Sequence, residues 1–129
     1  MEVTLSDSDV LIDYLNGREP SFAAVARLLR GEALRTSTVT RFEIFSGVRN
    51  VREREAADRL FLAMPPTLAL SDDAAMAAAI INRVLRREGN PLPAPDIFIA
   101  GIAIAAGLPL LTRNVRHFNR VRGLVVITP

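Results

Sequence analysis

The chain has 129 residues, half of them hydrophobic, and a formal net charge of only +2. This length suits one domain with a proper core, and no apolar run approaches the roughly 18 residues that span a bilayer. All 16 basic residues are arginine and cysteine is absent, which excludes disulfides, thiolate metal sites and any mechanism that needs a lysine. No basic-and-apolar leader precedes the first predicted strand, so we expect a cytoplasmic protein without a membrane segment.

The first junction of the chain places an acid between a strand and a helix. Val3 and Leu5 alternate with polar residues and predict a short strand, whereas Val10 and Leu11 open a helical face. Asp7 lies between them, and ligands bind at the carboxyl ends of strands in an open parallel sheet. The structural alternative is that Asp7 only caps the helix.

A second acid follows the second predicted strand, residues 34–38, in a helix through residues 39–47. Glu43 is surrounded there by apolar residues. It either completes a capping box with Thr40 as N-cap, or it presents its carboxylate at the same edge as Asp7.

A third acid, Asp96, follows a proline-rich connection at residues 91–95 and precedes an almost wholly apolar stretch, residues 97–106. We expect Asp96 to be the N-cap or first residue of a buried helix. A fourth strand at residues 108–112 then leads to Asn114 at its carboxyl end.

The remaining elements complete an alternating pattern. In the helix over residues 53–64 the apolar stripe is either core or a surface for a partner; it comprises Ala57, Leu60, Phe61 and Met64. Ser71 caps a long helix whose first turn holds Asp72 and Asp73. The other predicted elements are a helix at residues 20–29 and strands at 67–70 and 124–127.

Strands that alternate with helices predict a three-layer α/β/α fold around a mostly parallel sheet of four to five strands, formed by one domain over residues 1–129. This topology brings Asp7, Glu43, Asp96 and Asn114 to one edge. Close carboxylates repel one another unless a cation neutralises them, and ligands that are all oxygen favour a hard ion such as Mg²⁺ or Mn²⁺.

Four segments together resemble the PIN-domain toxins of the VapC type, in order and across essentially the whole chain. They are DSDVLIDYL at 7–15, STVTRFE at 37–43, DIFIA at 96–100 and LTRNVRHF at 111–118. The resemblance implies a PIN-like fold, a Mg²⁺- or Mn²⁺-dependent endoribonuclease, a small antitoxin partner of the VapB type and a homodimer.

The resemblance also assigns positions. Asp7, Glu43 and Asp96 take the places of the three principal acids of the family, as catalytic and metal-binding residues, with Ser8, Asp9 and Thr112 in support. The fourth place, often acidic in the family, is Asn114 here, which puts a fully charged second metal site in doubt.

The expected chemistry is hydrolysis of a phosphodiester bond with the help of a carboxylate-held cation. Asp7 and Asp96 are expected to be direct ligands, and Glu43 either a ligand or a base acting through water. Arg113 and Arg116 are candidate contacts to RNA phosphates, with solvated surface as the alternative. His117, the only histidine, is interpreted as a loop residue.

Two other functions fit parts of the pattern. Asp7-x-Asp9 after a strand also resembles the nucleophile and acid of haloacid-dehalogenase-like phosphatases, with Asp72 and Asp73 as the later acidic pair. That scheme usually needs a separate cation, commonly lysine. The second alternative is a non-catalytic PIN-like domain that binds RNA or a partner, against which the intact set of three acids argues.

Overall fold

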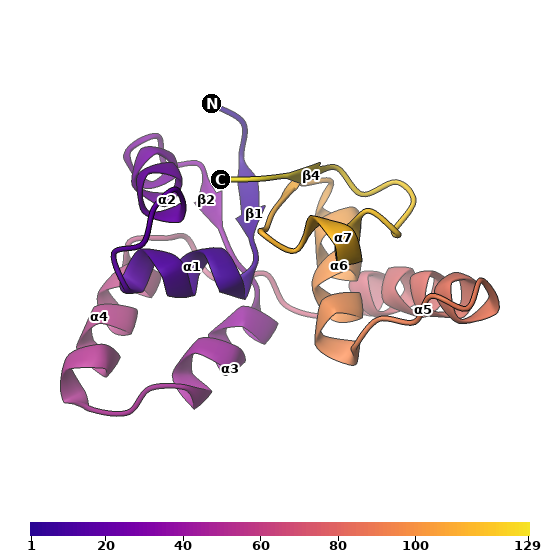
Figure 1. The fold of residues 1–129 in the computed structure, drawn as a ribbon, viewed down its shortest axis with the longest axis horizontal. Coiled ribbons are helices and arrows are strands. Elements are labelled where there is room, and N and C mark those ends of the chain that lie inside the picture. Colours follow the sequence, from indigo (N-terminus) through magenta and orange to yellow (C-terminus); the bar gives the residue numbers. More distant parts are fainter.

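A computed structural model describes all residues, 1–129, and its centre is a sheet of four parallel strands in the order β2-β1-β3-β4 (Figure 1). The central strand β1 pairs with β2 through Thr4 opposite Leu34 and with β3 through Leu5 opposite Leu110. The strands are short: β1 (Thr4–Ser6), β2 (Leu34–Arg35), β3 (Leu110–Leu111) and β4 (Val126–Ile127).

Seven helices connect and cover these strands. Their bounds are α1 (Ser8–Leu15), α2 (Ser21–Arg30), α3 (Thr38–Ser46), α4 (Val51–Leu62), α5 (Asp72–Arg87), α6 (Ala94–Ala106) and α7 (Val115–Phe118). None of them combines the length and the hydropathy needed to cross a bilayer.

Two hydrophobic clusters lie on opposite faces of the sheet, because neighbouring strand residues point to opposite sides. On β3, Leu110 packs with α5 and α6, whereas Leu111 packs with α1, α2 and α4. In Figure 1 the indigo-to-magenta helices α1–α4 accordingly lie on one side of the strands and the orange helices α5 and α6 on the other. The predicted three-layer α/β/α arrangement is confirmed.

Several predicted elements differ from the structure in extent. Residues 67–70 form no strand; only Leu68 makes an isolated parallel bridge, to Ser37. Ser37 had been placed inside the second strand, but its hydroxyl caps α3 by accepting from the Thr40 N–H at 3.1 Å. Asp96 is the third residue of α6 rather than its N-cap or first residue.

The apolar stripe on α4 belongs to the core and is not an open surface for a partner. Ala57, Leu60 and Phe61 on α4, and Met64 just after it, are all buried and pack with Val10 and other residues of α1 and α2. Their burial follows from the position of α4, whose inward face completes the cluster that α1 begins.

Candidate active site

The site begins at Asp7, where β1 ends and α1 starts. Its side chain caps α1 by accepting from the Ser8 N–H at 2.8 Å, so the predicted capping role is real. Its other oxygen accepts from the Thr112 hydroxyl at 2.8 Å, across the sheet at the end of β3. One carboxylate oxygen of Asp7 therefore caps α1, and the other is held by the residue that follows β3.

Asp9, in the first turn of α1, lies beside Asp7. Its Oδ2 accepts from the Arg113 N–H at 3.0 Å and is 3.4 Å from the Thr112 hydroxyl. Its other oxygen, Oδ1, is buried and has no hydrogen-bond partner. A buried carboxylate oxygen without a donor is costly, and a bound cation would offset that cost.

The electrostatics follow from burial. Burial is the largest cause that raises the pKa of Asp7 to about 7; the charge on Asp9 adds to it, and Asp96 contributes in the same direction. The hydrogen bonds from Thr112 and the Ser8 N–H oppose the increase. Burial also raises the pKa of Asp9, against the opposing effect of the Arg113 N–H.

Glu43 reaches the site from α3 and takes no part in a capping box. Because Ser37, not Thr40, is the N-cap, the Glu43 carboxylate is free of that role. It accepts instead from the Ser8 hydroxyl at 2.5 Å, and the same hydroxyl is 3.0 Å from the Thr40 hydroxyl. Ser8, predicted to be a supporting residue, therefore joins α1 to α3.

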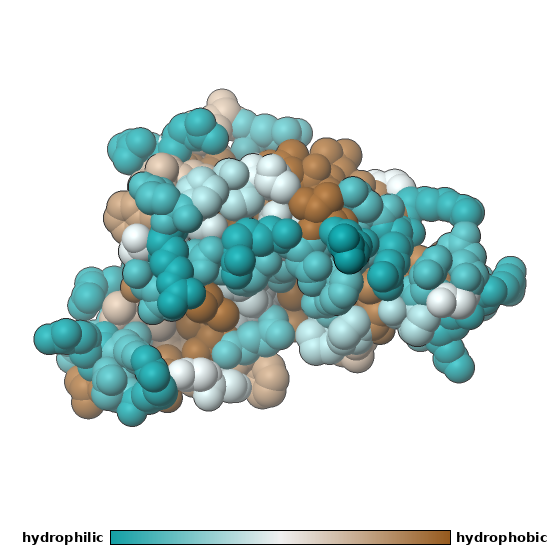
Figure 2. Space-filling view, viewed as in Figure 1, coloured by the Kyte–Doolittle hydropathy of each residue, from teal (hydrophilic) through white to brown (hydrophobic).

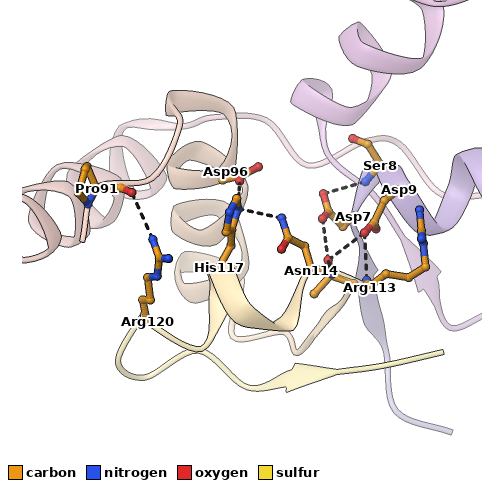
Figure 3. Close-up of polar contacts among 10 residues, drawn as sticks. Asp7, Ser8, Asp9, Pro91, Asp96, Arg113, Asn114, His117 and Arg120 are labelled. Atoms are coloured by element: carbon orange, nitrogen blue, oxygen red, sulfur yellow. Dashed lines mark hydrogen bonds and ion pairs between the residues drawn. The ribbon is translucent and has the colours of Figure 1, made fainter. Parts of the chain in front are cut away.

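Asp96 extends from the first turn of α6 toward the loop after β3. Its Oδ2 is 3.1 Å from His117 Nδ1, and the same ring nitrogen is 2.8 Å from Asn114 Nδ2 (Figure 3). The interpretation of His117 as a loop residue was wrong: it lies in α7 and contacts two predicted site residues. The sequence held no signal for this, because the contact joins residues 21 positions apart.

The two arginines near this loop differ. The Arg113 guanidinium pairs with buried Asp13 at 2.8 Å, and Asp13 also accepts from the Ser21 hydroxyl at 3.1 Å. Arg113 thus fastens the loop to α1, a structural role that its prediction as a phosphate contact did not include. Arg116 is exposed on α7 and makes no side-chain hydrogen bond or ion pair.

The donor set suits a hard divalent cation, although the acids do not converge. No group of three or more acidic, histidine or cysteine side chains is close enough in this structure to hold an ion. The acids are instead held separately: Asp7 and Asp9 by Thr112, Glu43 by Ser8, and Asp96 by His117. All offer oxygen, and the unpartnered Asp9 Oδ1 and the unfavourable charge at Asp7 are the features that a cation would relieve.

The parallel sheet with acids at its carboxyl edge defines an α/β domain whose family a comparison with known proteins identifies. Residues 5–124 match the model described as the PIN domain, so the chain belongs to the PIN-domain family. Among curated relatives, ribonuclease VapC19 of Mycobacterium tuberculosis is 34% identical over 115 residues, which cover 88% of this chain and 90% of that protein. The tRNA(fMet)-specific endonuclease VapC of Shigella flexneri is 30% identical over 121 residues, covering 92% and 91%.

Solved structures agree on the fold. VapBC2 from Rickettsia felis, bound to a DNA fragment from its promoter, matches with a TM-score of 0.86 over 98% of each chain at 15% identity. A toxin–antitoxin complex from Klebsiella pneumoniae matches with a TM-score of 0.77 at 25% identity, over 98% of this chain and 97% of that one. The resemblance drawn from four sequence segments is confirmed.

Proposed function

We propose that this protein is the endoribonuclease toxin of a type II toxin–antitoxin system and hydrolyses RNA phosphodiester bonds with Mg²⁺ or Mn²⁺. The observation that carries the proposal is that Asp7, Asp9, Glu43 and Asp96 lie at one edge of a PIN-domain sheet, each held by its own hydrogen-bond partner. VapC relatives named as ribonucleases, at 34% and 30% identity over most of the chain, support the substrate class. We also propose that the protein acts in the cytoplasm, because its proposed substrate is RNA.

Each residue has a proposed task. Asp7 and Asp96 would hold the ion directly, and Glu43 would bind it or take a proton from water through its second oxygen. The ion, when bound, would activate water and stabilise the charge that develops on the phosphate. Thr112 and Ser8 orient Asp7 and Glu43, and Asn114 can donate or accept a hydrogen bond but cannot take the proton.

Arg116 is the arginine proposed to contact RNA phosphate, because its side chain is exposed beside the site and is not committed to a partner. Arg113 has about half of its side chain exposed but is anchored by Asp13, so its contribution to RNA binding would be indirect.

Cleavage of a labelled RNA by the purified protein tests the proposal. We expect cleavage with Mg²⁺ or Mn²⁺, none with EDTA, and at least a hundredfold loss in Asp7→Asn, Glu43→Gln and Asp96→Asn under saturating metal. Asp58→Asn, which changes an exposed acid on α4, is the matched control and should cleave normally. Normal cleavage by any two of the three site variants would rule out this mechanism.

The two alternative functions lose support. The phosphatase scheme needs Asp72 and Asp73 near Asp7, but both are exposed in the first turn of α5, and the chain is a PIN domain. The non-catalytic alternative predicts RNA binding without cleavage in every metal condition, so the EDTA experiment distinguishes it.

We also propose a VapB-type antitoxin as the partner. Because the α4 stripe is buried, the antitoxin needs another surface. A pocket of about 520 Å³ between α1, α3 and α4, lined in part by Ile12, Leu15 and Ile44, could receive a segment of it. Hydrophobic side chains are visible at the surface between α1 and α3 in Figure 2. Glu43 also lines this pocket, so a bound segment would lie beside the acids.

The homodimer implied by the family remains a proposal. Apolar side chains that are exposed in the single chain, such as Phe42 on α3 and Met76 and Ile80 on α5, are available to a second copy. Light scattering of the protein alone and with its partner measures both assemblies.

A further inference from the structure

A continuous set of hydrogen bonds connects Asp7 to Asp96 through the segment that follows β3. The Asn114 N–H donates to the Thr112 hydroxyl at 2.9 Å, and that hydroxyl donates to Asp7 at 2.8 Å. The Asn114 side chain is 2.8 Å from His117 Nδ1, which is 3.1 Å from Asp96. Figure 3 shows Asn114 between His117 on one side and the Asp7–Asp9 pair on the other. One short segment therefore contacts acids from two different elements.

The position of the His117 ring is fixed by its neighbours. Phe118, the next residue, is fully buried in the cluster under α5 and α6, and Val121 is buried beside it. These anchors fix α7 against α6, which directs the ring toward the first turn of α6. The Asp96 side chain is 21% exposed and that of His117 35%, so the contact is partly shielded from water.

His117 Nδ1 faces both the Asn114 amide and the Asp96 carboxylate, which limits the possible tautomers of the ring. A carboxylate that binds a cation is ionised and can only accept, so His117 Nδ1 must carry the hydrogen and donate it to Asp96. The group of Asn114 that faces the same N–H must then be its carbonyl oxygen. The two ends of an amide are distinguished only by their hydrogen bonds, and here the ionised Asp96 selects the orientation.

We propose that His117 is a positioning residue for the metal site: it donates from Nδ1 to Asp96 Oδ2 and leaves Asp96 Oδ1 for the ion. This inference rests on the proposed function, in which Asp96 is a ligand. Outer hydrogen bonds of this kind fix the orientation of a ligand, and their loss typically lowers metal affinity about 10- to 100-fold. Asn114, held by the same ring, has its amide directed by His117 rather than serving as an independent fourth ligand.

Mn²⁺ binding measured by calorimetry on the full, RNA-free chain tests the role without reference to activity. His117→Leu removes the donor and should raise the Mn²⁺ dissociation constant at least tenfold. His117→Asn places an amide NH₂ where Nδ1 lies and should restore most of the affinity. Asn119→Ala, an exposed change at the end of the same helix, is the matched control and should bind as the parent does.

Cleavage rates separate positioning from direct participation in the reaction. Because the defect of His117→Leu is one of affinity, raising Mn²⁺ well above its new dissociation constant should recover most of the rate. Melting temperatures in EDTA show whether the variants fold; should the leucine variant unfold, His117→Ala provides the same comparison.

Three outcomes would overturn the inference. They are unchanged Mn²⁺ affinity in His117→Leu, equal weakening in the leucine and asparagine variants, and a lost rate that saturating Mn²⁺ does not recover. Failure of the parent itself to bind Mn²⁺ would instead refute the metal-dependent function proposed above, so the two failures are distinguishable.

Discussion

Asp7 has both a structural and an electrostatic role in the site. Its side chain is buried, caps α1, accepts a hydrogen bond from the Thr112 hydroxyl and lies beside Asp9. Its hydrogen bonds favour the ionised form, but burial and the neighbouring charges outweigh them and raise its pKa to about 7. In the metal-free protein this carboxylate is therefore a source of instability, which is common for groups that are placed for binding rather than for folding.

The raised pKa of Asp7 predicts a pH-dependent stability. The folded state binds this proton more tightly than the unfolded chain, so the stabilisation is complete below about pH 4 and is lost as the pH rises through about 7. Asp7→Asn removes the dependence. In EDTA, its free energy of unfolding should match that of the parent near pH 4 and exceed it by roughly 2–4 kcal/mol at pH 8.

Urea unfolding at a series of pH values measures this difference. Asp58→Asn is again the control, because Asp58 is exposed on α4 and should give a difference near zero throughout. A constant offset between Asp7→Asn and the parent across the whole range would mean that Asp7 titrates normally in the folded protein.

At the scale of elements, the most extensive helix contact is between α5 and α6. Gly101 of α6 lies so near α5 that an added Cβ would be 2.6 Å from the Ala74 carbonyl oxygen and 2.9 Å from the Ala78 backbone nitrogen. Backbone atoms cannot move aside as a flexible side chain can. Since α6 carries Asp96 and packs against α5, this contact helps to fix the position of Asp96.

Gly101→Ala is therefore expected to destabilise the protein by about 1–3 kcal/mol, even though alanine favours a helix by about 1 kcal/mol. Gly47→Ala is the matched control. Gly47 has a negative φ and an added Cβ there meets nothing closer than 3.6 Å, so its effect should be neutral or slightly stabilising. Chemical unfolding of both variants measures the two effects, and equal stability would show that α5 and α6 separate at little cost.

The helices were more predictable from sequence than the strands or the contacts of the site. Ser71 caps α5 through local chemistry, as predicted, and α6 ends at Gly107 directly after the apolar stretch of residues 97–106. The strands are only two or three residues long, so their extent depends on pairing with distant residues, as the single bridge at Leu68 shows. The positions of the acids followed from topology, but the partners of Glu43 and Asp96 are tertiary contacts that no local pattern encodes.

Across the whole molecule, the site draws its acids from all three layers. Glu43 comes from α3, whose Ile44 packs in the cluster on one face of the sheet, and Asp96 from α6, whose Ile97 packs in the cluster on the other. Asp7 follows the central strand between them. A cation held by these carboxylates would join elements from both faces of the sheet, so metal binding should stabilise the entire fold rather than one loop.

The melting temperature with and without Mn²⁺ tests this joining role. A ligand bound only by the folded state stabilises it by mass action, which amounts to about 2.7 kcal/mol at 100 times its dissociation constant. We expect an increase in the parent and none in Asp7→Asn or Asp96→Asn. The two variants remove one carboxylate from different layers, so both should abolish the increase if a single ion contacts both layers. An increase lost in Asp7→Asn but kept in Asp96→Asn would place the ion on the Asp7–Asp9 pair alone, where the unpartnered Asp9 oxygen would be its second ligand.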